Sequence, residues 1–426
     1  MMQSIKRIFL RNPTLIENRA KTNNKVCMVV WNTFETDARV TKEATSLIQA
    51  GKDVTVVAVH QPNRTLRKET TKGISIVRVD RTVRKRETSA SNTTSNRGNI
   101  TVKPSVSKLS KIKKSVRSFF RFVPQMVINV RFFLEAYSQN AGIYHAHDLN
   151  TLIPVYLASR LRGAKLVYDA HEVSTDRAGW KNKRYWEFVE GFLIRRAEKV
   201  ITTNLTRAEY FKKVYHIDLP FIIRNVPPFE QITHSDKLRH VCHISSDEPI
   251  ILYQGGMQRD RGIENMIKVI PLVKTGKFVF LGNGKLKGEL ISLVEEMGLQ
   301  ERVYFLEAVP NDELLEYTSS ATIGLQLLIN TCFNHYSACS NKLNEYMMAG
   351  IPVVASDLPE IRRVVDEFQT GILVDPENLK EIANAINLLL DDKDFYQQCK
   401  NNTILAAKKN NWESERLELI RIYELN

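Results

Sequence analysis

Residues 26–60 read VCMVVWNTFETDARVTKEATSLIQAGKDVTVVAVH, and the order of apolar and polar residues in them indicates the fold class. Its two ends, Val26–Trp31 and Asp53–His60, are short runs of β-branched and other apolar residues, which are typical of buried strands. The segment Ala38–Ala50 between them has the apolar spacing of an amphipathic helix, and Gly51 is a suitable residue to end it. A strand, a helix and a second strand in this order predict a parallel βαβ unit.

The same alternation continues through most of the 426 residues, with two interruptions. Residues 80–114 are rich in Ser, Thr, Asn and basic residues, and we expect a loop or insertion there. The polar stretch from Asn225 to Glu248 lacks periodicity and has the composition of a connection between domains. A second series of six expected strands begins at Pro249. The pattern predicts an α/β protein of two doubly wound domains, with the ligand at the carboxyl ends of the strands.

The chain has 61 Lys and Arg residues against 47 Asp and Glu, a net charge of +14, and 43% of its residues are hydrophobic. This composition is that of a water-soluble globular protein and excludes a disordered chain. Between Arg81 and Arg131 lie 13 basic residues and one acid, Glu87, so this stretch alone carries +12. Such a stretch can attract nucleic acid, an anionic membrane or an anionic substrate. Because nothing outside it resembles a base-reading module, we do not expect nucleic acid to be a partner.

The five cysteines are odd in number and include no Cys-x-x-Cys pair, which predicts neither a disulfide framework nor a thiolate zinc site. The apolar run near the start of the sequence is interrupted at Lys6, Arg7 and Arg11, which does not fit the core of a signal peptide. No segment approaches the roughly 18 uninterrupted apolar residues of a membrane span. We therefore expect a cytoplasmic protein whose contact with a membrane is at most peripheral.

Residues 340–356, SNKLNEYMMAGIPVVAS, are the most informative candidate site. Ser340 can cap a helix that ends at Gly350, and Lys342 and Glu345 share one face of its first turns. A phosphate at this helix start would meet backbone N–H groups and the Lys342 ammonium, while Glu345 could accept hydrogen bonds from a ribose diol. The alternative is a surface Lys–Glu ion pair, which the spacing alone favours.

Two glycine-containing turns follow expected strands in the second half. In residues 253–262, YQGGMQRDRG, the glycines let a ligand approach the backbone, and arginine suits bidentate contact with phosphate. The alternative for this segment is a plain turn with arginines on a solvated rim. Residues 281–285, LGNGK, form a similar turn but lack the Gly-x-Gly-x-x-Gly spacing of a dinucleotide site.

Residues 143–148, IYHAHD, place His145 and His147 on one face at the end of an expected strand. Two such histidines could bind a metal, but no convincing third ligand is evident apart from the separate segment YDAHE at 168–172. Strand-end histidines are also common as hydrogen-bonding residues. Asp392-Lys-Asp394 formally matches a metal-binding Asp-x-Asp pattern, yet its place between two helices predicts a solvated turn. No metal site is therefore expected.

Together, these segments resemble the retaining nucleotide-sugar glycosyltransferases of family 4, which have the GT-B fold of two Rossmann-like domains facing a cleft. Residues 341–356 resemble the family's donor-binding motif. The supporting segments occur in family order over about residues 25–425: Asp37–Ala44, His145–Asp148, Tyr168–Glu172, Ile223–Pro227, Tyr253–Gly256, Arg261–Gly262, Leu281–Gly284 and Gly371–Pro376.

The resemblance implies a domain organisation as well as a fold. We expect C-terminal helices that cross back to the first domain. The predicted parts are a basic N-terminal extension at 1–24, a Rossmann-like acceptor domain at 25–228 with a basic insertion at 81–131, a linker at 229–248, a Rossmann-like donor domain at 249–408 and a C-terminal helix at 409–426.

Roles for individual residues follow from the resemblance. It implies that Glu345 binds the ribose, that Lys342 and Arg261 contact the diphosphate, and that His147 lies beside the reacting sugar. The catalytic set is then His147, Arg261 and Lys342. The predicted donor-binding residues are Gly255, Gly256, Arg259, Gly284, Asn341 and Glu345.

Two positions depart from the family pattern. Ser337 stands where the family has the first Glu of a Glu-x7-Glu pair, the residue that holds the sugar hydroxyls. Gly256 stands where an arginine is usual, and Arg259 could supply that charge. The residues that could substitute for the missing Glu are His335, Tyr336 and Asn334.

The resemblance predicts transfer of a hexose from a nucleotide diphosphate sugar to a hydroxyl of a glycan or lipid-linked acceptor, with retention, in cell-surface polysaccharide or glycolipid biosynthesis. Arg261, Lys342 and the helix N-terminus would stabilise the departing diphosphate without a metal, and no cofactor is expected. The alternative is a nucleotide-sugar epimerase or hydrolase on the same fold.

The basic residues at 103–121 adjoin an aromatic and apolar segment, Phe119–Leu134. A cationic strip beside an amphipathic segment is typical of docking on an anionic leaflet. We expect residues 81–134 to bind the inner face of the cell membrane. The alternative is a solvated insertion whose apolar half is buried against the first domain.

Overall fold

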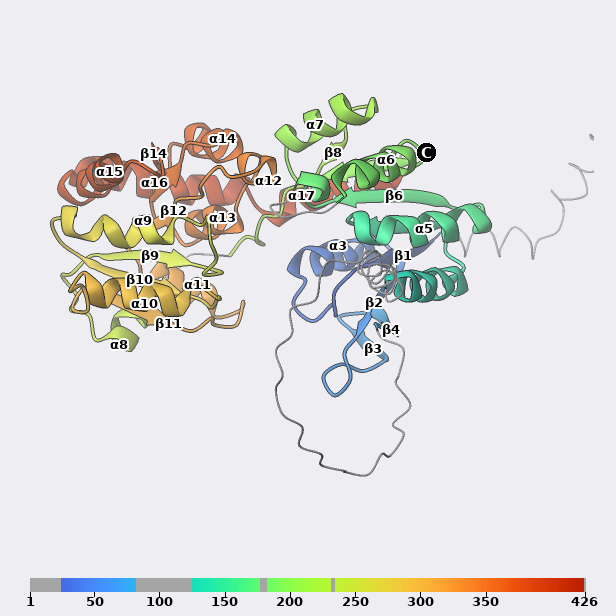
Figure 1. Ribbon diagram of the computed structural model, residues 1–426, viewed down its shortest axis with the longest axis horizontal. Coiled ribbons are helices and arrows are strands. Elements are labelled where there is room, and N and C mark those ends of the chain that lie inside the picture. The colour runs from blue at the N-terminus through green and yellow to red at the C-terminus, as the bar shows by residue number, and fades with distance from the viewer. Residues whose placement is uncertain (1–23, 82–124, 177–181, 231–233, 425–426) are drawn as a thin grey trace, which may run out of the picture. The chain divides into compact units, whose positions relative to one another are not determined.

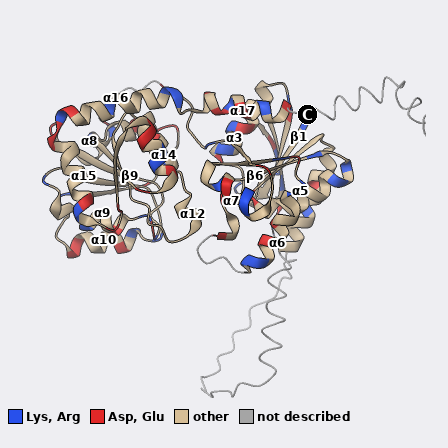
Figure 2. Cartoon of the chain, turned by 90° about the horizontal axis from the view of Figure 1, so that it is seen from above, with Lys and Arg blue, Asp and Glu red and all other residues tan. Residues whose placement is uncertain are grey.

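The computed structural model describes residues 24–81, 125–176, 182–230 and 234–424 (Figure 1). The chain divides into two compact units, Met1–Asp169 with Phe192–Val200 and Ala170–Gly191 with Ile201–Asn426. Most of the predicted basic insertion lies outside the described residues, and the domain boundaries inferred from composition stay predictions. On the described helices, acidic and basic residues are interspersed (Figure 2), as expected once the basic stretch is set aside.

The larger sheet is predominantly parallel, as the opening βαβ pattern predicts. Its first strand pairs in parallel with both of its neighbours, the strand that follows it in sequence and the one that begins at Ile143. This point of reversal is where a doubly wound sheet places its ligands. The antiparallel hairpin of β3 (Lys68–Thr71) and β4 (Ile74–Asp80) was not predicted, because β3 is short and contains no apolar residue. The strand order is β3 (Lys68–Thr71), β4 (Ile74–Asp80), β2 (Asp53–His60), β1 (Lys25–Val29), β5 (Ile143–His147), β6 (Lys165–Ala170), β7 (Lys199–Thr202) and β8 (Phe221–Ile222).

The smaller sheet confirms the six strands predicted for the second half. All its strand pairs are parallel, and the point of reversal lies between the two central strands. Alternate residues of these strands enter two apolar clusters: Ile251 and Phe278 belong to one, Leu252 and Val279 to the other. The strand order is β11 (Val303–Leu306), β10 (Lys277–Leu281), β9 (Ile250–Gln254), β12 (Ile323–Gln326), β13 (Val353–Ser356) and β14 (Gly371–Val374).

Helices connect the strands, and one further helix covers residues 125–139 (Figure 1). The predictions missed α7 (Leu205–Tyr215), α8 (Lys237–Cys242), α12 (Phe333–Tyr336) and α14 (Pro359–Phe368). Two of these, α8 and α12, are ten or more residues shorter than α16, which has 17 residues. The helices are α3 (Ala38–Gln49), α5 (Leu149–Arg162), α6 (Lys183–Ile194), α7 (Leu205–Tyr215), α8 (Lys237–Cys242), α9 (Ile263–Lys268), α10 (Lys287–Glu296), α11 (Leu314–Ser319), α12 (Phe333–Tyr336), α13 (Asn341–Met348), α14 (Pro359–Phe368), α15 (Leu379–Asp391), α16 (Lys393–Lys409) and α17 (Trp412–Glu424).

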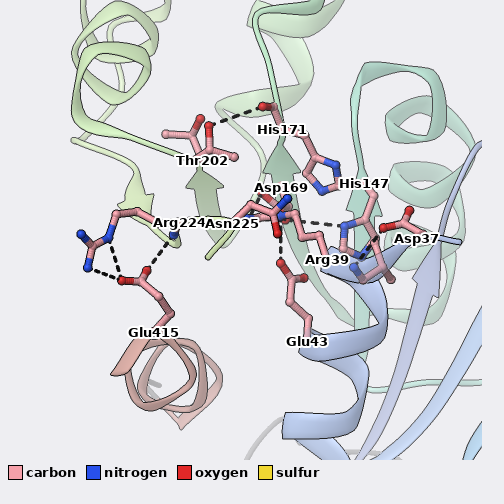
Figure 3. A network of polar contacts seen from close by, with 12 residues as sticks. Asp37, Arg39, Glu43, His147, Asp169, His171, Thr202, Arg224, Asn225 and Glu415 are labelled. Carbon is pink, nitrogen blue, oxygen red and sulfur yellow. Dashed lines mark hydrogen bonds and ion pairs between the residues drawn. The ribbon is translucent and has the colours of Figure 1, made fainter. Parts of the chain in front are cut away.

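The C-terminal helix α17 is tied to residues near the end of the predicted first domain. The Trp412 amide donates to the Pro227 carbonyl at 2.9 Å. The Glu415 carboxylate accepts from the Arg224 amide at 2.7 Å and from Arg224 Nε at 2.8 Å (Figure 3). These contacts confirm the expectation that the C-terminal helices cross back to that part of the chain.

Candidate functional site

The two glycine turns of the smaller sheet pack against each other at the carboxyl ends of β9 and β10. The Gly255 amide donates to the Leu281 carbonyl, and the Met257 amide donates to the Asn283 carbonyl, both at 2.9 Å. A Cβ on Gly284 would lie 2.0 Å from the Met257 carbonyl oxygen. The need for glycine at position 284 is therefore explained by backbone packing, whether or not a ligand binds there. Gly255, Gly256 and Gly284 all keep an exposed face at this edge of the sheet.

Lys342, in the first turn of α13, extends to the exposed turn at Gly255. Lys342 is only 9% exposed to solvent, and its Nζ lies 5.0 Å from the centre of the Tyr253 ring. Gly255 has a φ of +118°, which strains any other residue, and a Cβ there would also lie 3.3 Å from this Nζ, so glycine suits the position on both counts. The alternative of an ordinary surface Lys–Glu pair is therefore wrong for this lysine.

Burial, together with the positive charge of Arg261, lowers the pKa of Lys342 from 10.5 to about 8, while Glu345 opposes the change. Arg261 is half-buried, and neither cation forms an ion pair with a described residue. Ser340 occupies the N-cap position of α13, but its side chain makes no capping hydrogen bond, so the predicted cap is wrong in this respect. The start of α13 thus combines two neighbouring cations with an N-terminus that has no side-chain cap, which is suited to an anion.

Glu345 is held by a buried pair of polar residues that sequence reasoning missed. Gln254, the last residue of β9, donates from Nε2 to Glu345 Oε2 at 2.6 Å. Thr318 on α11 in turn donates from Oγ1 to Gln254 Oε1 at 2.8 Å. A glutamine at the end of an apolar strand was the available signal, but its partners lie 64 and 91 residues away in the sequence.

Two predicted donor-binding residues have other contacts. Arg259 donates from Nη2 to Glu289 Oε2 at 3.0 Å in an exposed pair, so the structure does not bring it to Lys342. Asn341 is the first residue of α13 and accepts from Asn225 Nδ2 at 3.1 Å. The Asp392 side chain caps α16 by accepting from the Phe395 amide, in agreement with its interpretation as part of a turn.

A second constellation lies in the first unit, at the carboxyl ends of β5 and β6 (Figure 3). Arg39 on α3 donates from Nη2 to both carboxylate oxygens of Asp169, at 3.0 and 2.9 Å, and its Nε lies 3.0 Å from Glu43 Oε1. His147 Nδ1 lies 3.6 Å from Asp169 Oδ2, and the His147 and His145 ring centres are 4.0 Å apart. All five side chains are buried.

The structure supplies the acidic neighbours that the sequence interpretation did not find for these histidines. One possible ligand atom each from Glu43, His145, His147 and Asp169 lies within 4.8 Å of the others. Arg39 already brings a positive charge to this cluster. Burial acts to lower the pKa of Arg39, but Asp169 and Glu43 outweigh it and raise the pKa above its ordinary value. A divalent ion would therefore have to displace a strongly held guanidinium, and the residues fit an internal ion-pair network better than a metal centre.

Comparison with known proteins gives the family. Residues 36–217 match the model of the glycosyl transferase 4-like domain, and residues 235–405 match that of the glycosyl transferases group 1. The chain belongs to the group 1 glycosyltransferases of family 4. Two such matches in this order confirm the resemblance drawn from the motifs.

Curated relatives are similar over part of their length. An uncharacterised glycosyltransferase of Methanocaldococcus jannaschii is 27% identical over 239 residues, covering 53% of this chain and 60% of that protein. The alpha-D-kanosaminyltransferase of Streptomyces kanamyceticus is 27% identical over 182 residues, covering 42% and 46%. The chain thus spans about half to three fifths of the length of these relatives.

Solved structures confirm the GT-B fold. Sucrose-phosphate synthase from Thermosynechococcus elongatus is similar with a TM-score of 0.73 at 18% identity, covering 94% of this chain and 98% of that one. HepE of Anabaena, in complex with UDP-glucose, has a TM-score of 0.69 at 14% identity, with 94% and 99% covered.

The buried ammonium predicts a measurable dependence of stability on pH. Because folding lowers the pKa of Lys342 from 10.5 to about 8, the unfolded chain binds more protons between these values, and stability should rise with pH across that window. Replacing the lysine with methionine, Lys342→Met, should raise the free energy of unfolding by up to about 3 kcal/mol at pH 7, with the gain shrinking towards pH 10.5.

Urea unfolding between pH 7 and pH 10.5 measures this difference. The matched control is Lys285→Met, which removes the same charge from an exposed position in the neighbouring turn. A Lys342→Met variant that is less stable than the wild type at pH 7, or a gain that is independent of pH, would contradict the buried-cation description.

Proposed function

We propose that this protein transfers a sugar from a nucleotide diphosphate sugar to an acceptor hydroxyl with retention of configuration. The observation that carries the proposal is the buried Lys342 ammonium beside Arg261, under the exposed turn at Gly255. Two adjacent cations that form no ion pair with a described residue are costly unless an anion of matching charge binds. A diphosphate supplies that charge.

Each part of the donor has a candidate contact. Glu345, oriented by Gln254, accepts hydrogen bonds from the ribose diol. Lys342, Arg261 and the start of α13 bind the diphosphate. As the bond from the sugar to the diphosphate breaks, negative charge grows on the leaving oxygen, and these fixed charges stabilise it. Loss of one such group commonly costs about 3 kcal/mol of transition-state stabilisation.

His147 is proposed to contact the reacting sugar and position donor or acceptor, without forming a covalent bond. The Arg39–Asp169 pair fixes the carboxylate beside its Nδ1. HepE was crystallised with UDP and with UDP-glucose, which makes uridine nucleotides the first probes to try. Transfer of a hexose without a metal is part of the proposal.

A thermal-shift screen against UDP, GDP and ADP tests the donor site. At least one should raise the melting temperature, because a ligand that binds only the folded state stabilises it. Lys342→Ala and Glu345→Ala should abolish or strongly reduce the shift, whereas the exposed Lys285→Ala should keep it. No shift with any nucleoside diphosphate would overturn the proposal. Release of free sugar at the same rate with and without acceptor would favour a hydrolase instead.

We also propose that the acceptor is lipid-linked or a surface glycan, reached by peripheral docking on an anionic membrane. The helix at 125–139 has one apolar side that is buried, where the ring centres of Phe132 and Trp31 lie 5.4 Å apart. Its other side exposes Met126, Val130 and Leu134 by 63, 53 and 56%. This exposed stripe, with the basic residues that precede it in sequence, supports docking. The described residues include no helix long and apolar enough to cross a membrane.

Sedimentation with vesicles tests docking. The full chain should bind vesicles that contain phosphatidylglycerol but not pure phosphatidylcholine, and the combined change of Met126, Val130 and Leu134 to Ser should reduce binding at least fivefold. Leu417→Ser, which removes a similarly exposed leucine from α17, is the control. Equal sedimentation of the triple variant and the wild type would contradict docking through this helix.

A further inference from the structure

Ser337, at the position of the missing glutamate, is not a direct substitute for it. It is fully buried, its Oγ accepts from Arg207 Nε at 3.2 Å, and its carbonyl accepts from Asn204 Nδ2 at 2.7 Å. The hydroxyl and the carbonyl of this residue are therefore both used in hydrogen bonds to the start of α7. Recognition of the sugar must come from a neighbouring residue.

Two of the three candidate substitutes are poorly placed. Asn334 uses both ends of its amide, since Oδ1 accepts from Arg207 Nη2 at 3.1 Å and Nδ2 donates to Glu172 Oε2 at 2.6 Å. Tyr336 is exposed, and its ring packs 5.9 Å from that of Phe333. Neither side chain is both fixed and available to a ligand.

His335 is held in a defined orientation beside the donor site. Its Nδ1 lies 3.1 Å from the Ile329 carbonyl oxygen and 3.0 Å from Thr331 Oγ1. The Ile329 amide donates to the Asp260 carbonyl at 3.0 Å, and Thr331 Oγ1 donates to Asp260 Oδ2 at 3.2 Å. These hydrogen bonds hold the loop that precedes His335 against Asp260, the residue before Arg261 in the sequence.

These contacts also define the hydrogen-bonding state of the ring. Because the Ile329 carbonyl can only accept, Nδ1 of His335 carries a proton, and in the neutral ring Nε2 is the acceptor. Burial, together with the positive charge of Arg261, lowers the pKa of His335 and keeps the ring neutral at pH 7. A neutral Nε2 accepts a hydrogen bond from a hydroxyl group.

Glu345, Lys342, Arg261 and His335 neighbour one another in an order that matches the parts of a nucleotide sugar. Glu345 and Arg261 both lie close enough to Lys342 to shift its pKa. Arg261 also lies close enough to His335 to shift the pKa of that ring. A nucleotide sugar presents ribose, two phosphates and sugar in the same order. With Glu345 at the ribose and the cations at the phosphates, His335 falls at the sugar.

We propose that His335 contacts the transferred sugar, with Nε2 accepting a hydrogen bond from one of its hydroxyls in place of the carboxylate absent at position 337. This assignment rests on the proposed function and adds a specificity-determining residue to it. A carboxylate can accept from two neighbouring hydroxyls at once, whereas Nε2 has one acceptor site. The site therefore reads a single hydroxyl where the family pattern reads a pair.

Calorimetric titration compares a nucleoside diphosphate with its sugar conjugate: UDP with UDP-glucose, GDP with GDP-mannose and ADP with ADP-glucose. For the pair that the wild type binds, His335→Ala should weaken binding of the conjugate about three- to tenfold, the range for one hydrogen bond, and leave the free diphosphate unchanged. His335→Gln, which keeps an acceptor, should recover part of the loss. Tyr336→Ala is the neighbouring control and should change neither.

Equal weakening of diphosphate and conjugate by His335→Ala would place the residue at the phosphates and overturn the inference, as would no effect on either. Melting temperatures of the variants show whether they are folded. If the wild type binds none of the three diphosphates, the proposed function itself fails, and that result is distinct from a failure at His335.

Discussion

The proposed donor site is organised around the buried ammonium of Lys342. An ammonium removed from water and placed near a guanidinium opposes folding, so the surrounding structure must hold it there. Gly255 makes the space, the packed turns after β9 and β10 fix that glycine, and the start of α13 carries the lysine. The apolar clusters on the smaller sheet stabilise these elements independently of the cation, which allows the protein to retain an unfavourable charge for binding.

The first unit contains the opposite arrangement. Arg39 is at least as deeply buried, but Asp169 and Glu43 surround it, and its charge is balanced within the protein. Such a cation orients its neighbours, here the Asp169 carboxylate next to His147. Because two carboxylates neutralise its charge, it attracts an anionic ligand only weakly. The contrast between a balanced and an unbalanced buried cation separates the structural network from the proposed diphosphate site.

The sequence predicted the features that depend on local spacing. Strand and helix alternation, the six strands of the smaller sheet and the proximity of Lys342 to Glu345 all follow from residues a few positions apart. Contacts made between distant segments could not be predicted: Gln254 with Glu345, Glu43 with the histidine pair, and the bonds of Ser337. The choice of His335 over its neighbours likewise needed the structure, because all three residues fit the sequence pattern equally well.

If Lys342 binds the diphosphate as proposed, binding should take up protons near pH 8, where this buried ammonium is partly deprotonated in the free protein. Titration calorimetry at pH 8 in buffers of different ionisation enthalpy gives the number of protons taken up with the nucleoside diphosphate. With a pKa of about 8, the free lysine is about half protonated, and an adjacent anion should raise its pKa, so we predict an uptake of about half a proton. The same uptake in wild type and Lys342→Met, or none in the wild type, would show that Lys342 does not bind the diphosphate.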